Sequence, residues 1–428
     1  MKKRLFYALL LFVLTKTHAQ TLSKIEQDVL KSVDANMAST LQLLKESVNI
    51  NSGTFNVKGV KAVADMYAKE LRALGFTVEW LALPDSLKRA GHLVAYKKGK
   101  KGKKLFLIGH LDTVFEPDMP PNPFTMLNDS TATGQGVNDM KGGDVMMIAA
   151  MKALQQNGLL DDVSITIYMT GDEENAGHPR EVSRGDFIAR AKQHNIALGY
   201  ETAVGMGLVA TARRGASGWQ LTVEGKQGHS SGVFAAGGYG AIYEAARILN
   251  EFRETLSTQP YLTFNPGLFL GGSEVNYHEH SQSGEAAGKT NIISPKTVVL
   301  GDLRFLSEEQ KEKARDTMRQ IVARNLAGTK ASISFQDGIP SMPPTKGNEN
   351  LAQWVNQVSL DLGYGEVKAG NPGSRGAGDI SYVAQYLDCL DGLGASGKGA
   401  HAPGETINLN EYPKLIKRSA ILIYRLTR

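Results

Sequence analysis

The sequence predicts an α/β fold, in which a mostly parallel mixed sheet flanked by helices is interrupted by a smaller inserted α+β domain. The chain has 428 residues, which exceeds the size at which one hydrophobic core keeps growing, so two domains are expected. Short apolar runs that end in polar residues recur along the chain, and a helical pattern separates two of them, which is typical of parallel sheets. From about residue 213 the pattern changes to an alternation of apolar and polar residues, which is typical of a sheet with one open face.

Residues 1–19 are typical of a secretory signal peptide. Lys2, Lys3 and Arg4 precede an apolar run over 5–14, and a plausible cleavage site follows Ala19. The run is short for a membrane span, and a retained membrane anchor is the alternative. Because no lipobox cysteine follows, a lipoprotein anchor is not expected. We therefore expect a secreted or periplasmic protein without membrane attachment after cleavage.

The charge of the chain gives no reason to expect a nucleic acid partner. Cleavage of residues 1–19 would remove four basic residues and no acidic one, which lowers the formal net charge from +5 to +1. The lysine-rich segment 97–104 is predicted to be a solvated hairpin turn between strands at 92–96 and 105–109. The single cysteine, Cys389, stands in an apolar context and is predicted to be a small core residue, so no disulfide forms within one chain.

The first predicted elements are helical, from Leu22 to about Leu74, with a stop at Gly75 and a strand after it. A further amphipathic helix is predicted from about Gly142 to a stop at Asn157 and Gly158. Strands of the main sheet are predicted within four apolar segments, at 104–114, 163–174, 195–203 and 387–405. The α/β pattern resumes near residue 351 and ends with a helix through 415–426.

The second domain is predicted to span 213–328, inserted between catalytic-domain segments 20–212 and 329–428. Its segments alternate between strand and helix: a strand within 216–228, a helix over 240–256, a strand over 297–306 and a charged helix over 308–327. This order suits a small sheet with helices on one face.

Metal-binding side chains follow the apolar runs. Asp172, Glu173 and Glu174 stand side by side after one of them, and such close carboxylates raise each other's pKa unless a cation lies among them. Because parallel strands place ligands beyond their carboxyl ends, these groups are expected to converge. The candidates are His110, Asp112, Asp139, Glu173, Glu174, Glu201 and His401. Each motif alone is more often an ordinary solvated or hydrogen-bonded loop, but together they suit two zinc-like ions about 4 Å apart.

Four segments, "GHLDTVF", "GQGVNDMKGGD", "TGDEENAG" and "HAPGE", resemble the motifs of the M20 family of metallopeptidases, and the chain is most similar to its glutamate carboxypeptidase branch. The resemblance implies a di-zinc exopeptidase-like catalytic domain with two Zn²⁺ per chain, for which Co²⁺ or Mn²⁺ could substitute. It implies that Asp139 bridges the two ions, with His110 and Glu201 completing one site and Glu174 and His401 the other. Asp112 would orient His110, and Glu173 would be the general base.

The same resemblance implies a lid role for the inserted domain, which normally dimerises in this family. "GKQGHSSGV" is similar to the segment whose histidine, here His229, reaches the neighbouring subunit's active site and helps polarise the scissile carbonyl. "NIISPKTVVLGDLRF" is similar to the segment that binds the substrate's terminal carboxylate, here through Asn291 and Arg304. "GSRGAGDISYVA" resembles the family's glycine-rich pocket loop, in which Asp379 is expected either to cap the following helix or to touch substrate.

The chain departs from the glutamate-releasing relatives at three places. Glu201 stands where many of them carry Asp, as in the desuccinylase branch. The segment 335–344 has no arginine where they offer one, which puts glutamate specificity in doubt. The segment 276–290 is long and carries His278 and His280, which are expected to lie in an exposed lid loop rather than in a third metal site.

The expected function is cleavage of the amide bond next to a C-terminal amino acid with a free carboxylate, in short peptides or N-acyl amino acids. Metal-activated water would attack, with Glu173 as the base. One alternative is an aminoacylase or desuccinylase acting on an acylated amino acid. Another is a non-catalytic peptide-binding protein with the same fold.

Overall fold

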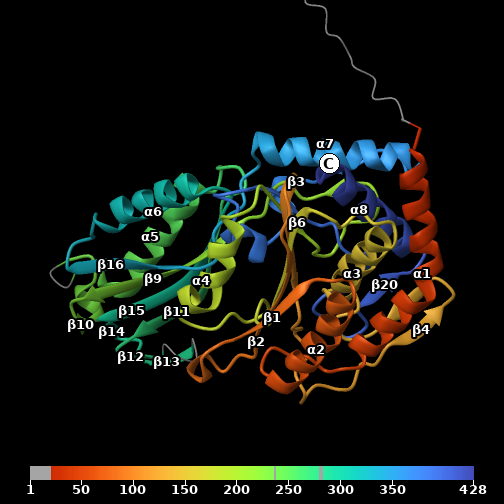
Figure 1. Cartoon of the computed structure of the whole chain (residues 1–428). Coiled ribbons are helices and arrows are strands. Elements are labelled where there is room, and N and C mark those ends of the chain that lie inside the picture. The colour runs from red at the N-terminus through yellow and green to blue at the C-terminus, as the bar shows by residue number, and fades with distance from the viewer. Residues whose placement is uncertain (1–20, 236–237, 279–282) are drawn as a thin grey trace, which may run out of the picture.

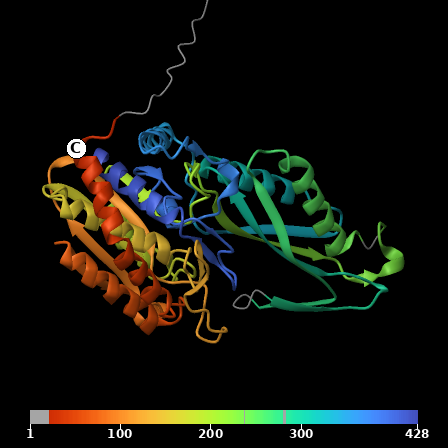
Figure 2. The ribbon, with the colours of Figure 1, turned by 90° about the vertical axis from the view of Figure 1, so that its right-hand side faces the viewer.

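The computed structural model describes residues 21–235, 238–278 and 283–428, which form a larger and a smaller domain side by side (Figures 1 and 2). The predicted signal peptide and His280 lie outside the described residues. Within the described ranges, no helix is both long and apolar enough to cross a membrane.

The larger domain is built on a six-stranded mixed sheet in the order β1 (Thr77–Ala82), β2 (Gly91–Lys97), β6 (Val163–Thr170), β3 (Lys101–His110), β7 (Ile196–Gly199) and β18 (Asp388–Leu390). The pairs β6–β3, β3–β7 and β7–β18 are parallel, whereas β1–β2 and β2–β6 are antiparallel. The predicted mostly parallel mixed sheet is therefore confirmed.

Both faces of this sheet are buried, which explains its continuous apolar runs. In β3, Leu105 and Leu107 face a core shared with α1 (Lys24–Val48), α2 (Val57–Ala73), α3 (Lys141–Gln156), α7 (Lys346–Asp361) and α8 (Tyr412–Leu426). Phe106 and Ile108 face a second core that includes Phe187 of α4 (Arg180–Ala191). Helix α3 has the predicted position, and its end at Gln156 agrees with the predicted stop.

The predicted helical segment 22–74 contains two helices. Helix α1 begins with a capping box, in which Ser23 and Glu26 exchange hydrogen bonds, and it ends at Val48. Asn56 then caps α2 through a hydrogen bond from the N–H of Gly59 to its side chain. The two periodic patterns run into one another in the sequence, so the short break at 49–56 was not predicted.

The predicted hairpin at 97–104 is wrong. Strands β2 and β3 do not pair, because β6 lies between them in the sheet. The connecting segment instead crosses the start of β6, where the N–H groups of Lys100 and Lys101 both donate to the carbonyl of Asp162 at 2.9 Å. Local sequence indicates that two strands are connected, but not that a third strand will enter between them.

The smaller domain contains a four-stranded antiparallel sheet in the order β11 (Thr263–Gly272), β15 (Lys296–Phe305), β9 (Gly215–Gly225) and β16 (Thr329–Asp337). Helices α5 (Gly240–Leu256) and α6 (Glu308–Val322) cover one face, where Trp219, Leu221 and Phe252 are among the core residues. Strand β16 pairs with β9 from Thr329 to Asp337. The small sheet therefore continues past residue 328, the end of the range assigned from sequence.

Short strand pairs complete the fold. The larger domain contains a second, small sheet in the order β19 (Gly397–Lys398), β20 (Thr406–Asn408), β5 (Thr131–Thr133) and β4 (Thr125–Asn128). It also contains a pair formed by β8 (Leu208–Val209) and β17 (Lys368–Ala369). In the smaller domain, β10 (Gly228–His229) pairs with β14 (Ile292–Ile293), and β12 (Glu274–His278) pairs with β13 (Ser283–Ala287). The pairing of β5 with β20 brings the segment before α3 next to the loop that carries His401.

Candidate metal centre and active site

Two groups of potential metal ligands share Asp139. His110, Asp139 and Glu201 form one group, and Asp139, Glu174 and His401 form the other; within each group the ligand atoms all lie within 4.8 Å of one another. Asp139 Oδ1 lies 3.4 Å from His110 Nε2, and Asp139 Oδ2 lies 3.0 Å from His401 Nε2. One carboxylate thus turns one oxygen toward each group.

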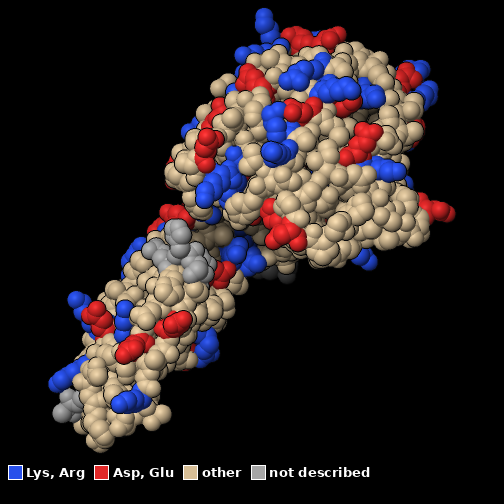
Figure 3. Space-filling model, turned by 90° about the horizontal axis from the view of Figure 1, so that it is seen from below, with Lys and Arg blue, Asp and Glu red and all other residues tan. Residues whose placement is uncertain are grey.

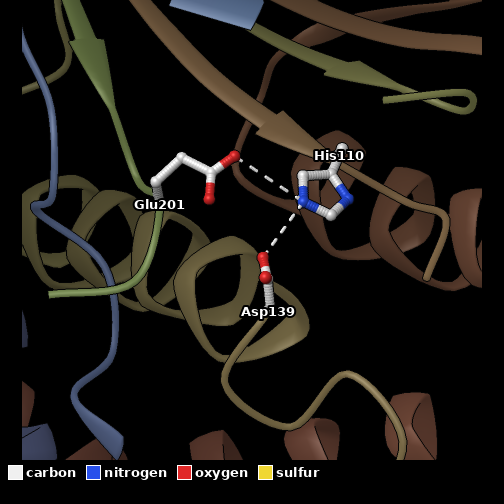
Figure 4. Close-up of side chains that lie close together, drawn as sticks. All are labelled: His110, Asp139 and Glu201. Atoms are coloured by element: carbon white, nitrogen blue, oxygen red, sulfur yellow. Dashed lines mark ion pairs between the residues drawn. The ribbon is translucent and has the colours of Figure 1, made fainter. Parts of the chain in front are cut away.

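The ligands come from separate elements that meet at one end of the main sheet. His110 ends β3, Glu201 follows β7 and Glu174 follows β6. Figure 4 shows the first group, in which His110 Nε2 faces both Asp139 and Glu201, 3.7 Å from Glu201 Oε1. In the second group, His401 Nε2 lies 3.2 Å from Glu174 Oε2. All five residues predicted as metal ligands are therefore brought together.

The residues present fit two divalent cations. Glu174 Oε1 is buried and has no hydrogen-bond partner among the described residues, as expected for an oxygen that binds an ion. Two imidazole nitrogens and three carboxylates, one of them shared, are a donor set typical of zinc and similar metals.

The electrostatics of the cluster also favour a bound cation. Burial, together with the charge of Asp139, raises the pKa of Glu201 to about 7. Burial and neighbouring carboxylates likewise raise the pKa values of Glu173 and Glu174. Hydrogen bonds to Asp139 and Glu174 raise the pKa of His401 to about 11. Without positive ions, these carboxylates cannot all be charged at once at low cost.

Asp112 positions the loop that carries the two glutamates. Its carboxylate accepts hydrogen bonds from the N–H of Glu173 at 3.0 Å, the N–H of Glu174 at 3.1 Å and the hydroxyl of Thr54 at 2.6 Å. His110 Nδ1 donates to the main-chain carbonyl of Asp112 at 2.9 Å, closer than the 3.5 Å to the carboxylate. The main chain of Asp112 therefore orients His110, and its side chain holds Glu173 and Glu174.

Glu405 supports the shared ligand and was not predicted as a site residue. Its Oε1 accepts the N–H groups of Asn138 at 2.6 Å and Asp139 at 2.8 Å, at a cis Asp139–Met140 peptide. Glu405 is the last residue of "HAPGE", so the motif that supplies His401 also supplies the group that holds Asp139. This motif is the sequence feature from which Glu405 could have been predicted as a site residue.

Asp172, the first of the three adjacent acids, is compensated by protein rather than by metal. It forms a buried ion pair with Arg184, which also donates to Asp379 at 2.8 Å. Asp379 accepts a further hydrogen bond from Thr170 at 2.6 Å and is buried. Asp379 is the first residue of a short 3-10 helix whose N-cap is Gly378, so it is not the capping residue. Its side chain belongs to this ion-pair network.

Glu173 points toward the first ligand group. It lines a narrow hollow together with His110, Glu201 and Asp379. Beside this hollow, the buried Arg213 pairs with Asp391, and its charge acts to lower the pKa of Glu201. Arg213 and Asp391 were not predicted, because no local pattern marks a pair of residues so far apart in sequence.

Two of the three predicted residues of the smaller domain, His229 and Asn291, lie away from these ligands within one chain. His229 and Asn291 are at the β10–β14 pair, at the end of the smaller domain far from β3 (Figure 1). There they line an open hollow with Lys289, and His229 Nδ1 lies 2.9 Å from the hydroxyl of Ser231. Arg304 is near the end of β15 and pairs with Asp302 at 2.8 Å.

Comparison with known proteins shows the same fold and family. Residues 106–425 match the sequence profile of "Peptidase family M20/M25/M40". The chain is 25% identical to carboxypeptidase G2 of Pseudomonas sp. (strain RS-16), over 90% of this chain and 88% of that protein. It is 24% identical to a succinyl-diaminopimelate desuccinylase of Coxiella burnetii (strain RSA 493 / Nine Mile phase I), over 89% and 97%.

Among solved structures, one similar to this chain is the Bacillus subtilis YXEP protein, described as a dinuclear metal binding peptidase of the M20 family. The two structures superpose with a TM-score of 0.64 at 15% sequence identity, over 92% of this chain and 99% of that one. The fold agrees with this structure. The family match and the similarity to carboxypeptidase G2 support a metal-dependent peptidase or amidohydrolase of the glutamate carboxypeptidase type. Because the family match covers three quarters of its length, this chain belongs to peptidase family M20/M25/M40.

Proposed function

We propose that this protein hydrolyses the amide bond next to a C-terminal amino acid with a free carboxylate, in short peptides or N-acyl amino acids. The observation that carries the proposal is the position of Asp139 between two ligand groups, with one oxygen toward His110 and the other toward His401. Two Zn²⁺ ions, or Co²⁺ or Mn²⁺ in their place, would bind there. When bound, they supply Lewis acidity that polarises a carbonyl and lowers the pKa of water.

Glu173 acts as the general base in this proposal. It shares its hollow with His110 and Glu201, and burial raises the pKa of its carboxyl well above the usual value. A carboxylate with a raised pKa is a better proton acceptor near neutral pH. Asp112 holds the Glu173 main chain in place. Glu173 takes a proton from water and delivers it to the leaving amine.

Substrate binding and dimerisation are linked in this proposal. His229 and Asn291 lie far from the ligands of their own chain, so they act on the active site of a second copy, with the smaller domain forming the dimer. An exposed apolar surface on that domain supports this arrangement: Phe234, Ile242 and Tyr243 are 56%, 42% and 54% exposed. Arg304 binds the terminal carboxylate, for which a planar guanidinium has suitable geometry.

The proposal includes export of the chain, with residues 1–19 removed as a signal peptide and the mature protein secreted or periplasmic. The test is N-terminal sequencing of protein recovered from each cell fraction. A mature N-terminus at Gln20 outside the cytoplasm is the expected result, and an intact N-terminus in the cytoplasm contradicts it.

The function is tested by mass-spectrometric product analysis of zinc-loaded protein incubated with a pool of dipeptides and N-acyl amino acids. Release of particular C-terminal amino acids by the wild type, and not by Glu173→Ala with equal metal content, is expected. Metal analysis should find about two ions per chain. A protein that binds no metal after zinc repletion would instead be a peptide-binding protein with this fold.

An aminoacylase or desuccinylase is the second candidate, favoured by Glu201, which matches the desuccinylase branch at this ligand position. The desuccinylase of Coxiella burnetii also aligns along 89% of this chain. The two functions share the same metal centre, and the pooled substrates separate them. Cleavage of succinyl or other acyl amino acids, with dipeptides left intact, selects this second candidate.

A further inference from the structure

Arg375 lies beside the metal centre without an acidic partner. Its guanidinium Nη1 lies 3.3 Å from the hydroxyl of Thr202, the residue that follows Glu201. The side chain is half-buried, and it forms no salt bridge with any residue that the structure describes. A guanidinium has five N–H donors, so most of its hydrogen-bonding capacity remains available to a ligand.

The loop that carries Arg375 is held by other groups. The N–H of Gly370 donates to the carbonyl of Val209 at 2.8 Å, and the N–H of Arg214 donates to the carbonyl of Arg375 at 3.1 Å. Arg213 Nε donates to the carbonyl of Gly376 at 2.8 Å. Since main-chain bonds and Arg213 fix this loop, the Arg375 side chain is not needed to build it.

Arg213 and Arg375 form an informative contrast. Arg213 contacts this loop and Arg375 belongs to it, but Arg213 is buried and neutralised by Asp391. Among the described residues, the Arg375 guanidinium contacts only the Thr202 hydroxyl. A half-buried charge without a partner costs free energy, and an arriving carboxylate recovers that cost. Arg304, the proposed anchor of the terminal carboxylate, is on a different element and already pairs with Asp302.

We propose that Arg375 is a specificity-determining residue that binds a second carboxylate of the substrate, the acidic side chain of a residue flanking the scissile bond. The inference rests on the proposed function and deepens it. The preferred substrates then carry an acidic residue, such as glutamate or aspartate, in addition to the free C-terminus.

The proposal is tested first by binding, without turnover. In the zinc-loaded Glu173→Ala background, calorimetry compares Ala-Glu with Ala-Gln and Glu-Ala with Gln-Ala, two pairs that differ only in a carboxylate or its amide. One acidic peptide is expected to bind about 10- to 100-fold more tightly than its amide, as is typical of a charged hydrogen-bonded pair. The pair that shows the difference identifies the side of the scissile bond that Arg375 reads.

Adding Arg375→Gln should reduce that difference to about one-fold or two-fold and leave binding of the amide peptides nearly unchanged, while Arg375→Lys should retain part of it. Arg253→Gln, at an exposed arginine of α5, is the matched control and should retain the full difference. Acid preference that persists in Arg375→Gln, absence of acid preference in both pairs, or equal loss for acidic and amide peptides would overturn the proposal. Thermal unfolding of each variant confirms that it is folded.

Turnover by the wild type separates this inference from the proposed function. If the wild type hydrolyses acidic and amide peptides equally well, the function stands and the role of Arg375 is refuted. If it hydrolyses none of them, but the charge-dependent binding is present and lost in Arg375→Gln, the proposed function fails and the role of Arg375 stands.

Discussion

Glu405 Oε1 accepts the main-chain N–H of Asp139 at 2.8 Å, so the position of the shared metal ligand depends on a residue 266 positions later in the chain. Glu405 is buried, and it also accepts the N–H of Asn138. Because Asp139 belongs to both ligand groups, a change in its main-chain position alters both groups.

Glu405→Ala is expected to weaken the binding of both ions about 10- to 100-fold, the range typical of groups that orient metal ligands. Glu405→Gln should weaken it less, because the amide oxygen can still accept these N–H groups. Competition with a chromophoric chelator measures both affinities. Glu349→Ala, at an exposed residue of α7 that pairs with Lys346, is the control and should be unaffected. Normal affinity in Glu405→Ala would show that the loop holds its conformation without this contact.

Asp112→Asn tests the support of the glutamate loop. The two carboxylate oxygens accept three hydrogen bonds, from Thr54 and from the N–H groups of Glu173 and Glu174. An amide replaces one acceptor with a donor that faces other donors, so we expect turnover to fall by about 100-fold or more. Thr54→Val removes only one of the three bonds and should cost less. Steady-state kinetics at saturating zinc provide the comparison, and equal effects of the two variants would contradict this assignment.

Arg184→Met should destabilise the protein by about 3–5 kcal/mol, because it leaves Asp172 and Asp379 buried without their shared cation. The Arg184 side chain is only 1% exposed, which gives little opportunity for solvent to compensate. Denaturant unfolding of the metal-free protein measures the change in the free energy of unfolding. Arg190→Met is the control, since Arg190 pairs with Glu79 and Asp186 at a more exposed position. A loss below about 1 kcal/mol in Arg184→Met, as for surface pairs, would contradict the expectation.

Metal stabilisation should increase as the pH rises from about 5 to 8. In the metal-free protein, burial raises the pKa of Glu201 to about 7, above its unfolded value, and hydrogen bonds raise that of His401 to about 11. These groups hold more protons in the folded state, so their contribution to stability is lost as pH rises through these values. A metal ion must displace the same protons, and its apparent affinity rises over this range.

The measurement is the zinc-induced shift in Tm at pH 5.5, 7 and 8. The number of protons released on binding can be determined by calorimetry in two buffers. Glu201→Gln removes one titrating ligand and should reduce the proton release. A zinc-induced shift that does not change with pH would show that these groups do not compete with protons for the metal.

The sequence predicted which candidate ligands lie together better than it predicted the surroundings of those residues. These candidates stand at or near the ends of regular elements, and parallel strands bring such positions together: His110, Asp139, Glu174, Glu201 and His401. Arg184 and Arg213 lie in helical or linking segments that look like ordinary surface positions, although both are buried. Their acidic partners are known only once the chain is folded. The sequence therefore suggested a cation among the three adjacent acids, but it did not indicate that Asp172 pairs with Arg184.

In the fold, too, local features were predicted and contacts between distant segments were not. Amphipathic periodicity correctly predicted α3, α5 and the strand that became β15. The order of strands in the sheet depends on contacts between distant segments, so the insertion of β6 between β2 and β3 was not visible in the lysine-rich connection. Strand β16 was placed outside the smaller domain for a similar reason. Its partner β9 is about one hundred residues earlier, and nothing local indicates that pairing.

The proposed action of His229 on a second copy can be tested by complementation. His229 is exposed and belongs to β10, which lies at the end of the smaller domain far from β3 (Figure 1). On the surface of the molecule seen from below, basic and acidic residues are mixed over both domains (Figure 3), so self-association is not opposed by one dominant charge on that face. His229→Ala and Glu173→Ala should each be inactive alone.

Co-expression of the two variants should restore activity, because in a mixed dimer one site has Glu173 from one chain and His229 from the other. Random pairing makes half of the dimers mixed, and one of the two sites in each is intact, so about a quarter of wild-type activity is expected. Differently tagged chains purified in tandem isolate the mixed dimer, which should have about half of wild-type activity. If His229 acts within its own chain, or if the protein is monomeric, no combination of the two variants recovers activity. Recovery by mixing therefore separates a composite active site from a merely structural role of His229, because a structural defect in one chain is not repaired by its partner's histidine.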